Sequence, residues 1–171
     1  MNKYPAFTNL RSHISYKFSA LRTRALRDMF WTKLTGRNSS LATFPEELRS
    51  DSPNKKLLGV REIRVDQIIG TLNRFSDFDH EFRPVKKHLI NRWVDTFISL
   101  HHDEWSPILV HKIGEQYYVE DGHHRASVAR SVGMVFMEAK IWEYSTIQKQ
   151  PETSQRTVCA KHATPKSYVT G

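Results

Sequence analysis

The fold class that the sequence predicts is α/β (α+β in some conventions), a small mixed-sheet domain preceded by a basic helical arm. Three observations lead to it. Between residues 57 and 144, short apolar segments with the period of strands alternate with segments of helical period. A basic segment of helical period precedes them, and a polar stretch rich in Ser, Asn and Pro separates the two. With 171 residues, 39% of them hydrophobic, the chain is long enough to bury the core of one domain and to carry additional segments.

Residues 1–37 form the predicted arm, and a helix is expected over residues 10–34. Its apolar residues recur at spacings of three and four: Leu10, Ile14, Phe18, Leu21, Ala25 and Met29. Eight basic residues stand against Asp28 alone, so the arm carries +7 of the chain's net charge of +8. This charge suits nucleic acid or an anionic membrane surface. Packing of the apolar stripe on the body, or on a second copy in a homo-oligomer, is favoured, because most helices are stabilised by such burial.

Residues 38–56 are the predicted linker, with one short helical turn at residues 44–48. The compact domain is expected over residues 57–144 and a flexible tail over residues 145–171. Pro84 is expected to begin a helix with a four-residue apolar repeat, and Gly133 to end a second, shorter helix. The expected elements are, in order, a strand over 59–65, a charged loop over 66–83, a helix from 84, strands over 108–110 and 117–119 joined by a turn at 112–116, a helix over 125–132 and a strand over 135–142.

One cysteine, Cys159, is present, so neither a disulfide within the chain nor a cysteine-based metal site is predicted. A single cysteine is typical of a reducing compartment, and a cytoplasmic protein is expected. No apolar run approaches the ~20 residues that a membrane-spanning helix needs, so no transmembrane segment is expected.

The segment Asp121-Gly122-His123-His124-Arg125 lies between an expected strand and the helix that follows it. Gly122 allows a sharp turn, and the first amides of the next helix have no intrahelical partner, so they favour an anion. Arg125 adds a permanent charge, and His123 and His124 add donors or proton carriers with pKa values near neutrality. Asp121 is expected to cap the helix or to orient a histidine. This corner is the predicted phosphate-binding site.

Two other interpretations of the corner stay open. In the first, the Asp-Gly step is only a turn, with Asp121 as a helix cap. In the second, His123 and His124 bind a metal ion together with His101 and His102. The metal interpretation ranks below phosphate, because adjacent histidines rarely face one ion and no spaced pair of histidines supports it.

The order of elements around the corner resembles the ParB/sulfiredoxin superfamily. The resemblance covers roughly residues 57–144, about half of the chain. It implies a small mixed sheet in which the corner holds the phosphates of a ligand. The segments that carry it are residues 60–69, the Pro-Ile-Leu-Val strand at 107–110, the aromatic strand and corner at 117–125, the small-residue helix at 126–130, and Gly133.

Three branches of that superfamily differ at the corner. Sulfiredoxins have Gly-Cys-His-Arg, and His123 stands at the cysteine position, so sulfinic-acid chemistry is not expected. ParB proteins have Gly-Glu-Arg-Arg and bind CTP; Gly122 and Arg125 match that pattern, whereas His123 and His124 do not. The short polar sequence after residue 144 does not resemble the ParB helix-turn-helix domain. The free-serine kinase branch is the most similar, because it too uses Asp-Gly-His-His-Arg to hold nucleotide phosphates.

The charged loop at residues 73–84 is the second predicted part of the site, and the resemblance implies that it lies beside the corner. A kinase needs a carboxylate there as general base, and Asp77, Asp79 and Glu81 are the candidates. Arg74 and Arg83 would add positive charge around the transferred phosphate, with Mg²⁺ as the expected divalent cation. The alternative is a solvated loop whose phenylalanines pack on the body and whose charges pair locally.

Two functional hypotheses follow. In the first, the chain binds ATP, ADP or CTP at residues 121–125, and acts as a kinase or nucleotidase where an acid of the charged loop serves as base. In the second, it is a non-enzymatic, DNA-associated regulatory module, with the corner as a ligand sensor and residues 1–37 as the anchor on nucleic acid.

Overall fold

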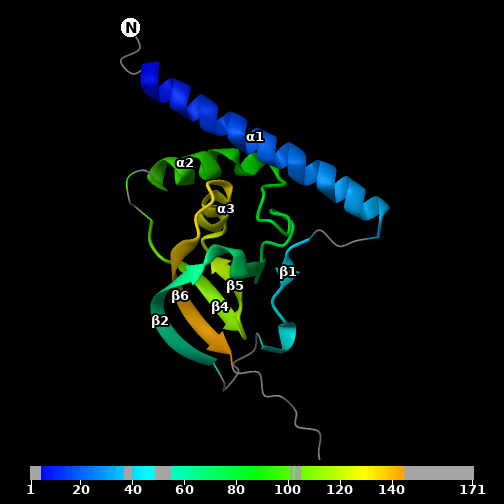
Figure 1. Cartoon of the computed structure of the whole chain (residues 1–171), viewed down its shortest axis with the longest axis vertical. Coiled ribbons are helices and arrows are strands. Elements are labelled where there is room, and N and C mark those ends of the chain that lie inside the picture. The colour runs from blue at the N-terminus through cyan, green and yellow to red at the C-terminus, as the bar shows by residue number, and fades with distance from the viewer. Residues whose placement is uncertain (1–4, 37–39, 49–54, 101, 103–104, 145–171) are drawn as a thin grey trace, which may run out of the picture.

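The computed structural model describes residues 5–36, 40–48, 55–100, 102 and 105–144. Within them the chain forms one six-stranded mixed sheet with α-helices stacked beyond one end of it (Figure 1). The predicted α/β class is confirmed. The helices are α1 (Pro5–Leu34), α2 (Ile90–Leu100) and α3 (His123–Ser131), with the 3-10 helices η1 (Glu46–Leu48), η2 (Val65–Gln67) and η3 (Lys87–Leu89). The strands are β1 (Ala42–Thr43), β2 (Lys55–Arg64), β3 (Ile68–Thr71), β4 (Ile108–Ile113), β5 (Gln116–Asp121) and β6 (Phe136–Tyr144).

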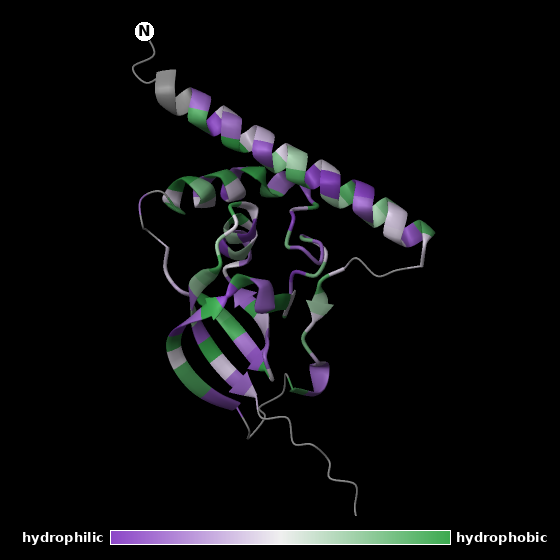
Figure 2. Ribbon diagram, viewed as in Figure 1, coloured by the Kyte–Doolittle hydropathy of each residue, from purple (hydrophilic) through white to green (hydrophobic). Residues whose placement is uncertain are grey.

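The strand order β1-β3-β5-β4-β6-β2 places β5 and β4 at the centre of the sheet. Strands β1, β3 and β5 run parallel, β4 runs antiparallel to β5 and parallel to β6, and β2 pairs antiparallel with β6 at the edge. Hydrophobic and hydrophilic residues alternate along β2 and β6 in Figure 2, as expected where one face of a sheet lies on the core. Because α3 connects β5 to β6, it begins at the centre of the sheet.

Helix α1 is part of the folded body. Ile14 and Phe18 are each only 1% exposed, and the Phe18 ring lies edge-on to Trp93 of α2 with 5.7 Å between centroids. The Arg22 guanidinium also donates to the Val85 carbonyl at 2.8 Å. Figure 1 shows α1 lying across α2, with α3 beneath α2. The apolar stripe of the predicted arm therefore packs on the body, which was the favoured alternative.

Part of the predicted linker is folded. Strand β1 pairs in parallel with β3, and Leu41 and Phe44 on either side of it are buried. The Phe44 ring lies edge-on to Tyr118, with centroids 5.4 Å apart. The predicted helical turn is present as η1, and β2 already begins at Lys55. A two-residue strand is too short to show a period of two, so the polar composition of its neighbours dominates the sequence pattern.

The helix predicted from Pro84 begins later. Pro84 forms an isolated β-bridge with Phe78, and the Val85 amide donates to the Asp77 carbonyl at 2.9 Å. Extended pairing of this kind excludes helical geometry, so the helical residues begin only with η3 and α2. The segment predicted as a loop over residues 66–83 contains strand β3, which ends before the charged loop at residues 73–84. The predicted tail, residues 145–171 with Cys159, lies outside the described residues. Among the helices that the structure describes, none has the length and apolar character of a membrane-spanning segment.

Replacing Phe18 with alanine tests whether α1 is part of the folded body. Its side chain is 1% exposed, so its loss should lower the free energy of unfolding by about 3 kcal/mol in urea denaturation. Tyr16→Ala is the control, because Tyr16 is on the same helix and 74% exposed. That variant should change stability by less than about 0.5 kcal/mol. Equal effects of the two substitutions would show that α1 does not pack on the body.

Candidate functional site

The corner after β5 depends on Gly122. Its backbone is left-handed, with φ 99° and ψ 21°, and a Cβ atom at this position would lie 2.8 Å from the Cβ atom of Ile108. Both facts restrict the position to glycine. The first intrahelical bond of α3 runs from the Ala126 amide to the Gly122 carbonyl at 2.9 Å. The amides of residues 123–125 therefore have no acceptor within α3, which is the arrangement that favours an anion.

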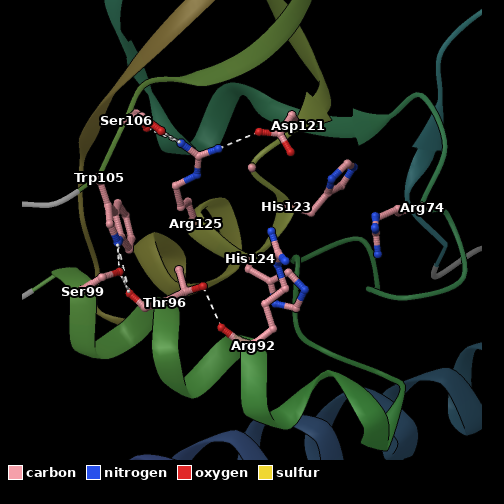
Figure 3. A pocket seen from close by; sticks show the side chains of 11 residues that line it. Arg74, Arg92, Thr96, Ser99, Trp105, Ser106, Asp121, His123, His124 and Arg125 are labelled. Atoms are coloured by element: carbon pink, nitrogen blue, oxygen red, sulfur yellow. Dashed lines mark hydrogen bonds and ion pairs between the residues drawn. The ribbon is translucent and has the colours of Figure 1, made fainter.

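A cavity of about 290 Å³ opens at this end of α3 (Figure 3). Its wall is built from four places in the chain: the segment after β3, helix α2, the segment before β4, and the corner itself. Three arginines, two histidines and three hydroxyl groups line it, against a single carboxylate. The lining residues are Arg74, Arg92, Thr96, Ser99, Trp105, Ser106, Asp121, Gly122, His123, His124 and Arg125.

Arg125 holds the cavity wall together. Its guanidinium donates to the Ser106 carbonyl, to Ser106 Oγ at 2.7 Å and to the Pro107 carbonyl at 3.2 Å. The other end of the guanidinium pairs with Asp121 at 2.7 Å. Helix α3 has no side-chain cap, so Asp121 is not the helix cap that the sequence indicates. The pairing neutralises part of the Arg125 charge and fixes the segment before β4 against the corner.

Two further arginines supply charge beside the histidines. Arg92 comes from α2, and no carboxylate among the described residues pairs with it. Arg74 follows β3 and pairs with Asp77 at 3.2 Å. Figure 3 shows Arg74 and Arg125 on opposite sides of His123 and His124. The cavity therefore keeps a positive field after the Arg125–Asp121 pair is accounted for.

His123 is held as one neutral tautomer. It is 4% exposed, and its Nε2 lies 2.6 Å from Thr71 Oγ1. The same Oγ1 accepts hydrogen bonds from the amides of Asn73 and Arg74 at 3.2 and 3.1 Å. With both lone pairs of the oxygen occupied, the Thr71 hydroxyl donates to His123 Nε2, which assigns the imidazole proton to Nδ1.

Both histidines are neutral at pH 7. Burial is the largest cause that lowers the pKa of each from 6.5 to about 4, and nearby arginines lower it further, Arg74 beside His123 and Arg92 beside His124. This differs from the expectation of pKa values near neutrality. The reason is tertiary: the sheet, α2 and the Phe78 ring enclose the two imidazoles, with Phe78 stacked on His123 and edge-on to His124.

His124 lines the cavity and also carries an unpartnered polar atom. The residue is 7% exposed, and its Nδ1 is buried without a hydrogen-bond partner among the described residues. Most buried polar side-chain atoms in proteins have a partner, because leaving one unsatisfied costs about 1–3 kcal/mol.

The charged loop divides into two parts. Asp77, with a side chain 18% exposed, lies with Arg74 on the cavity side, and its charge acts on both histidines. Neither Asp79 nor Glu81 lines the cavity. The Asp79 carboxylate is buried and accepts from the amides of Glu81 and Arg83 and from the Arg83 guanidinium, the closest contact being 2.6 Å.

Arg83 connects this loop to α1 and does not line the cavity. Its guanidinium pairs with Asp28 at 2.7 Å, with Asp79 at 2.6 Å and with Glu81 at 3.3 Å. The pairs of Arg83 with Asp79 and Glu81 are local, as in the solvated-loop alternative, whereas its pair with Asp28 joins the loop to α1. Of the five charged residues predicted in this loop, only Arg74 lines the cavity and only Asp77 pairs with it.

Sequence reasoning missed the contribution of α2. Arg92, Thr96 and Ser99 recur at spacings of four and three, which places them on one helical face beside the buried Trp93. This polar stripe was the available signal, but the apolar stripe that contains Trp93 dominates the pattern. Trp105, whose indole donates to the Thr96 carbonyl and Ser99 Oγ, carries no such signal.

The described part of the chain contains no candidate metal centre of the kind that the metal interpretation requires. No group of three or more His, Cys, Asp or Glu side chains gathers there in an arrangement that could hold an ion. His101 lies outside the described residues, and His102 does not line the cavity.

Comparison with known proteins gives a distant structural likeness. No family model matches the sequence, and no curated protein matches it. The crystal structure of sulfiredoxin from Arabidopsis thaliana is similar over 48% of this chain and 82% of that chain, with 22% sequence identity and a TM-score of 0.36. A likeness at this level implies no function for this chain.

The two neutral histidines predict acid-sensitive stability. Their pKa values are lowered from 6.5 to about 4, so between these values the unfolded chain binds protons that the folded chain excludes. The free energy of unfolding should therefore be fully retained above about pH 6.5 and fall as the pH falls toward about 4. Urea denaturation across this range measures the slope. His124→Gln should reduce the slope, whereas His13→Gln, at an exposed position of α1, should not. An unchanged slope in His124→Gln would contradict a buried, neutral His124.

Proposed function

We propose that this chain is a nucleotide-binding protein and that the phosphates of the nucleotide bind in the cavity at the N-terminus of α3. The observation that carries the proposal is the buried, unpartnered Nδ1 of His124. This atom has no hydrogen-bond partner among the described residues, and His124 itself lies at the N-terminus of α3 and lines the cavity together with three arginines. Amide donors, a neutral imidazole and arginine together form the donor set that phosphate oxygens accept from.

The residues divide into those that bind and those that position. The amides of residues 123–125, the His124 imidazole and the Arg92 guanidinium bind phosphate oxygens. Arg74 adds charge from the opposite wall. Arg125 acts mainly as a positioning residue, because Ser106, Pro107 and Asp121 already occupy its donors. A phosphate next to His124 favours the imidazolium form, so binding takes up protons below neutral pH.

The size of the cavity favours enclosure of the phosphates. Its volume of about 290 Å³ is at the lower limit of the range of small-molecule sites. The phosphate groups of ATP, ADP or CTP are therefore enclosed, and the nucleoside extends toward the opening. A Mg²⁺ ion would be held chiefly by phosphate oxygens, as is usual for this cation. Asp121, the carboxylate in the cavity lining, already pairs with Arg125 through one of its oxygens.

We further propose phosphoryl transfer to a hydroxyl group, with Asp77 as the general base among the three candidate carboxylates of the charged loop. The carboxylate of Asp79 is occupied by Arg83, and Glu81 lies with Arg83 on the side of α1. Asp77 is the remaining candidate, and its pairing with Arg74 at 3.2 Å orients its carboxylate. A substrate hydroxyl would have to lie between Asp77 and the bound phosphate.

Isothermal titration calorimetry with ATP, ADP and CTP, each with and without Mg²⁺, tests the binding. The wild-type chain should bind at least one of them. Arg92→Ala should weaken that binding about tenfold or more, because it removes a charge-assisted hydrogen bond to phosphate. Arg61→Ala is the control, since Arg61 is exposed on β2, away from the cavity. Absence of binding under all six conditions would end the proposal.

Asp77→Asn separates transfer from binding. If Asp77 is the base, the variant should retain nucleotide affinity within about threefold and lose about a hundredfold or more of the rate of phosphate release or transfer. Malachite-green detection of phosphate and mass detection of a phosphorylated hydroxyl compound measure the two outcomes. A variant with the wild-type rate would remove Asp77 from the mechanism and leave the nucleotide-binding proposal standing.

A further inference from the structure

The last turns of α1 carry an apolar surface that the body does not cover. Leu26, Phe30, Trp31 and Leu34 are 39%, 62%, 56% and 68% exposed, and the Phe30 and Trp31 rings contact each other with centroids 6.0 Å apart. In Figure 1 this end of α1 extends beyond α2. Single exposed apolar side chains are common, but four large ones within nine residues form a patch that indicates a partner.

The patch is distinct from the face that packs on the body. Leu26, Phe30 and Leu34 follow one another at intervals of four and form one stripe along the helix. Ala25, next in sequence to Leu26, is fully buried and faces the body, as Phe18 does. Helix α1 therefore has two apolar faces, one internal and one outward.

The surroundings of the outward patch are cationic. Arg24, Arg27 and Lys33 are exposed around it, and Asp28 is the single acidic residue in the first 37 positions. Asp28 is already paired with Arg83 at 2.7 Å, and its contact with Arg27 is longer, at 3.4 Å. The partner is therefore expected to be anionic as well as apolar.

These two properties distinguish among partners. A second copy of α1 would bring like charges together, which opposes association of two such patches. Nucleic acid would satisfy the cations, but contacts to its phosphates do not bury four large apolar side chains. An anionic bilayer satisfies both, because apolar side chains enter the boundary between headgroups and acyl chains, Trp favours that interface, and Arg and Lys contact the anionic headgroups.

We propose that the C-terminal half of α1 docks on an anionic lipid surface. Leu26, Phe30, Trp31 and Leu34 insert at the headgroup boundary, and Arg24, Arg27 and Lys33 contact the headgroups. The helix lies in the plane of the membrane, and the opposite face of α1 keeps its contacts with α2. This inference is independent of nucleotide binding in the cavity.

Flotation of the full chain with vesicles tests the proposal. The wild-type chain should float with vesicles of phosphatidylcholine that contain about 30 mol% phosphatidylserine, should bind phosphatidylcholine alone at least about tenfold more weakly, and should lose binding as salt is raised. The double variant Phe30→Ser/Leu34→Ser should bind the anionic vesicles at least about tenfold more weakly than the wild-type chain. Arg24→Glu/Arg27→Glu should do the same.

Phe136→Ser is the matched control, because Phe136 is 50% exposed on β6 and should leave vesicle binding unchanged. Circular dichroism and urea denaturation confirm that each variant is folded. Three results would overturn the proposal: no flotation of the wild-type chain with anionic vesicles, retardation of DNA without vesicle binding, or a dimer in solution that Phe30→Ser/Leu34→Ser abolishes while vesicle binding is absent.

Discussion

The contact between the Gly122 backbone and Ile108 is the constraint on which the site depends. Ile108 is the first residue of central strand β4 and is fully buried, so the corner after β5 rests on the middle of the sheet. A left-handed residue without a Cβ atom is what allows the chain to turn there. The N-terminus of α3, with its free amides, is thereby fixed where α2 and the segment after β3 can reach it. Arg125 then ties the segment before β4 to the same corner.

The electrostatics of the cavity follow from this enclosure. Burial keeps His123 and His124 neutral, so the positive field comes from arginines and helix amides rather than from imidazolium groups. Arg125 is paired with Asp121 and Arg74 with Asp77, which leaves Arg92 as the arginine of the lining that has no carboxylate partner among the described residues. In the proposed function, Arg92 would therefore contribute most to the binding of an anion. His124 is neutral, and its buried Nδ1 has no hydrogen-bond partner among the described residues, so in the proposed function it would supply a hydrogen bond to the phosphate.

The sequence predicts those features that neighbouring residues determine, and it misses those that depend on contacts between distant parts of the chain. The corner and the helices around Phe18 and Trp93 come from short-range patterns, and the sequence predicts them with shifted boundaries. Strand β1 is only two residues long and is stabilised by pairing with the distant strand β3, so the sequence around it shows no strand periodicity. Arg92 reaches the cavity only through the packing of α2 on α3, where the Trp93 indole donates to Ser127 at 2.9 Å. Arg83 of the charged loop faces α1 rather than the cavity, where it pairs with Asp28, 55 residues away in the sequence.

Helix α1 supports both walls of the cavity without lining it. Through Phe18 it packs on Trp93, the neighbour of Arg92, so it holds the α2 wall. Through Asp28 it holds Arg83 and hence the loop that carries Arg74 and Asp77. Phe18 and Asp28 make these contacts from the side of α1 that faces the body, whereas Leu26, Phe30 and Leu34 form a separate exposed stripe. A surface that binds this stripe would therefore leave the support of both cavity walls in place.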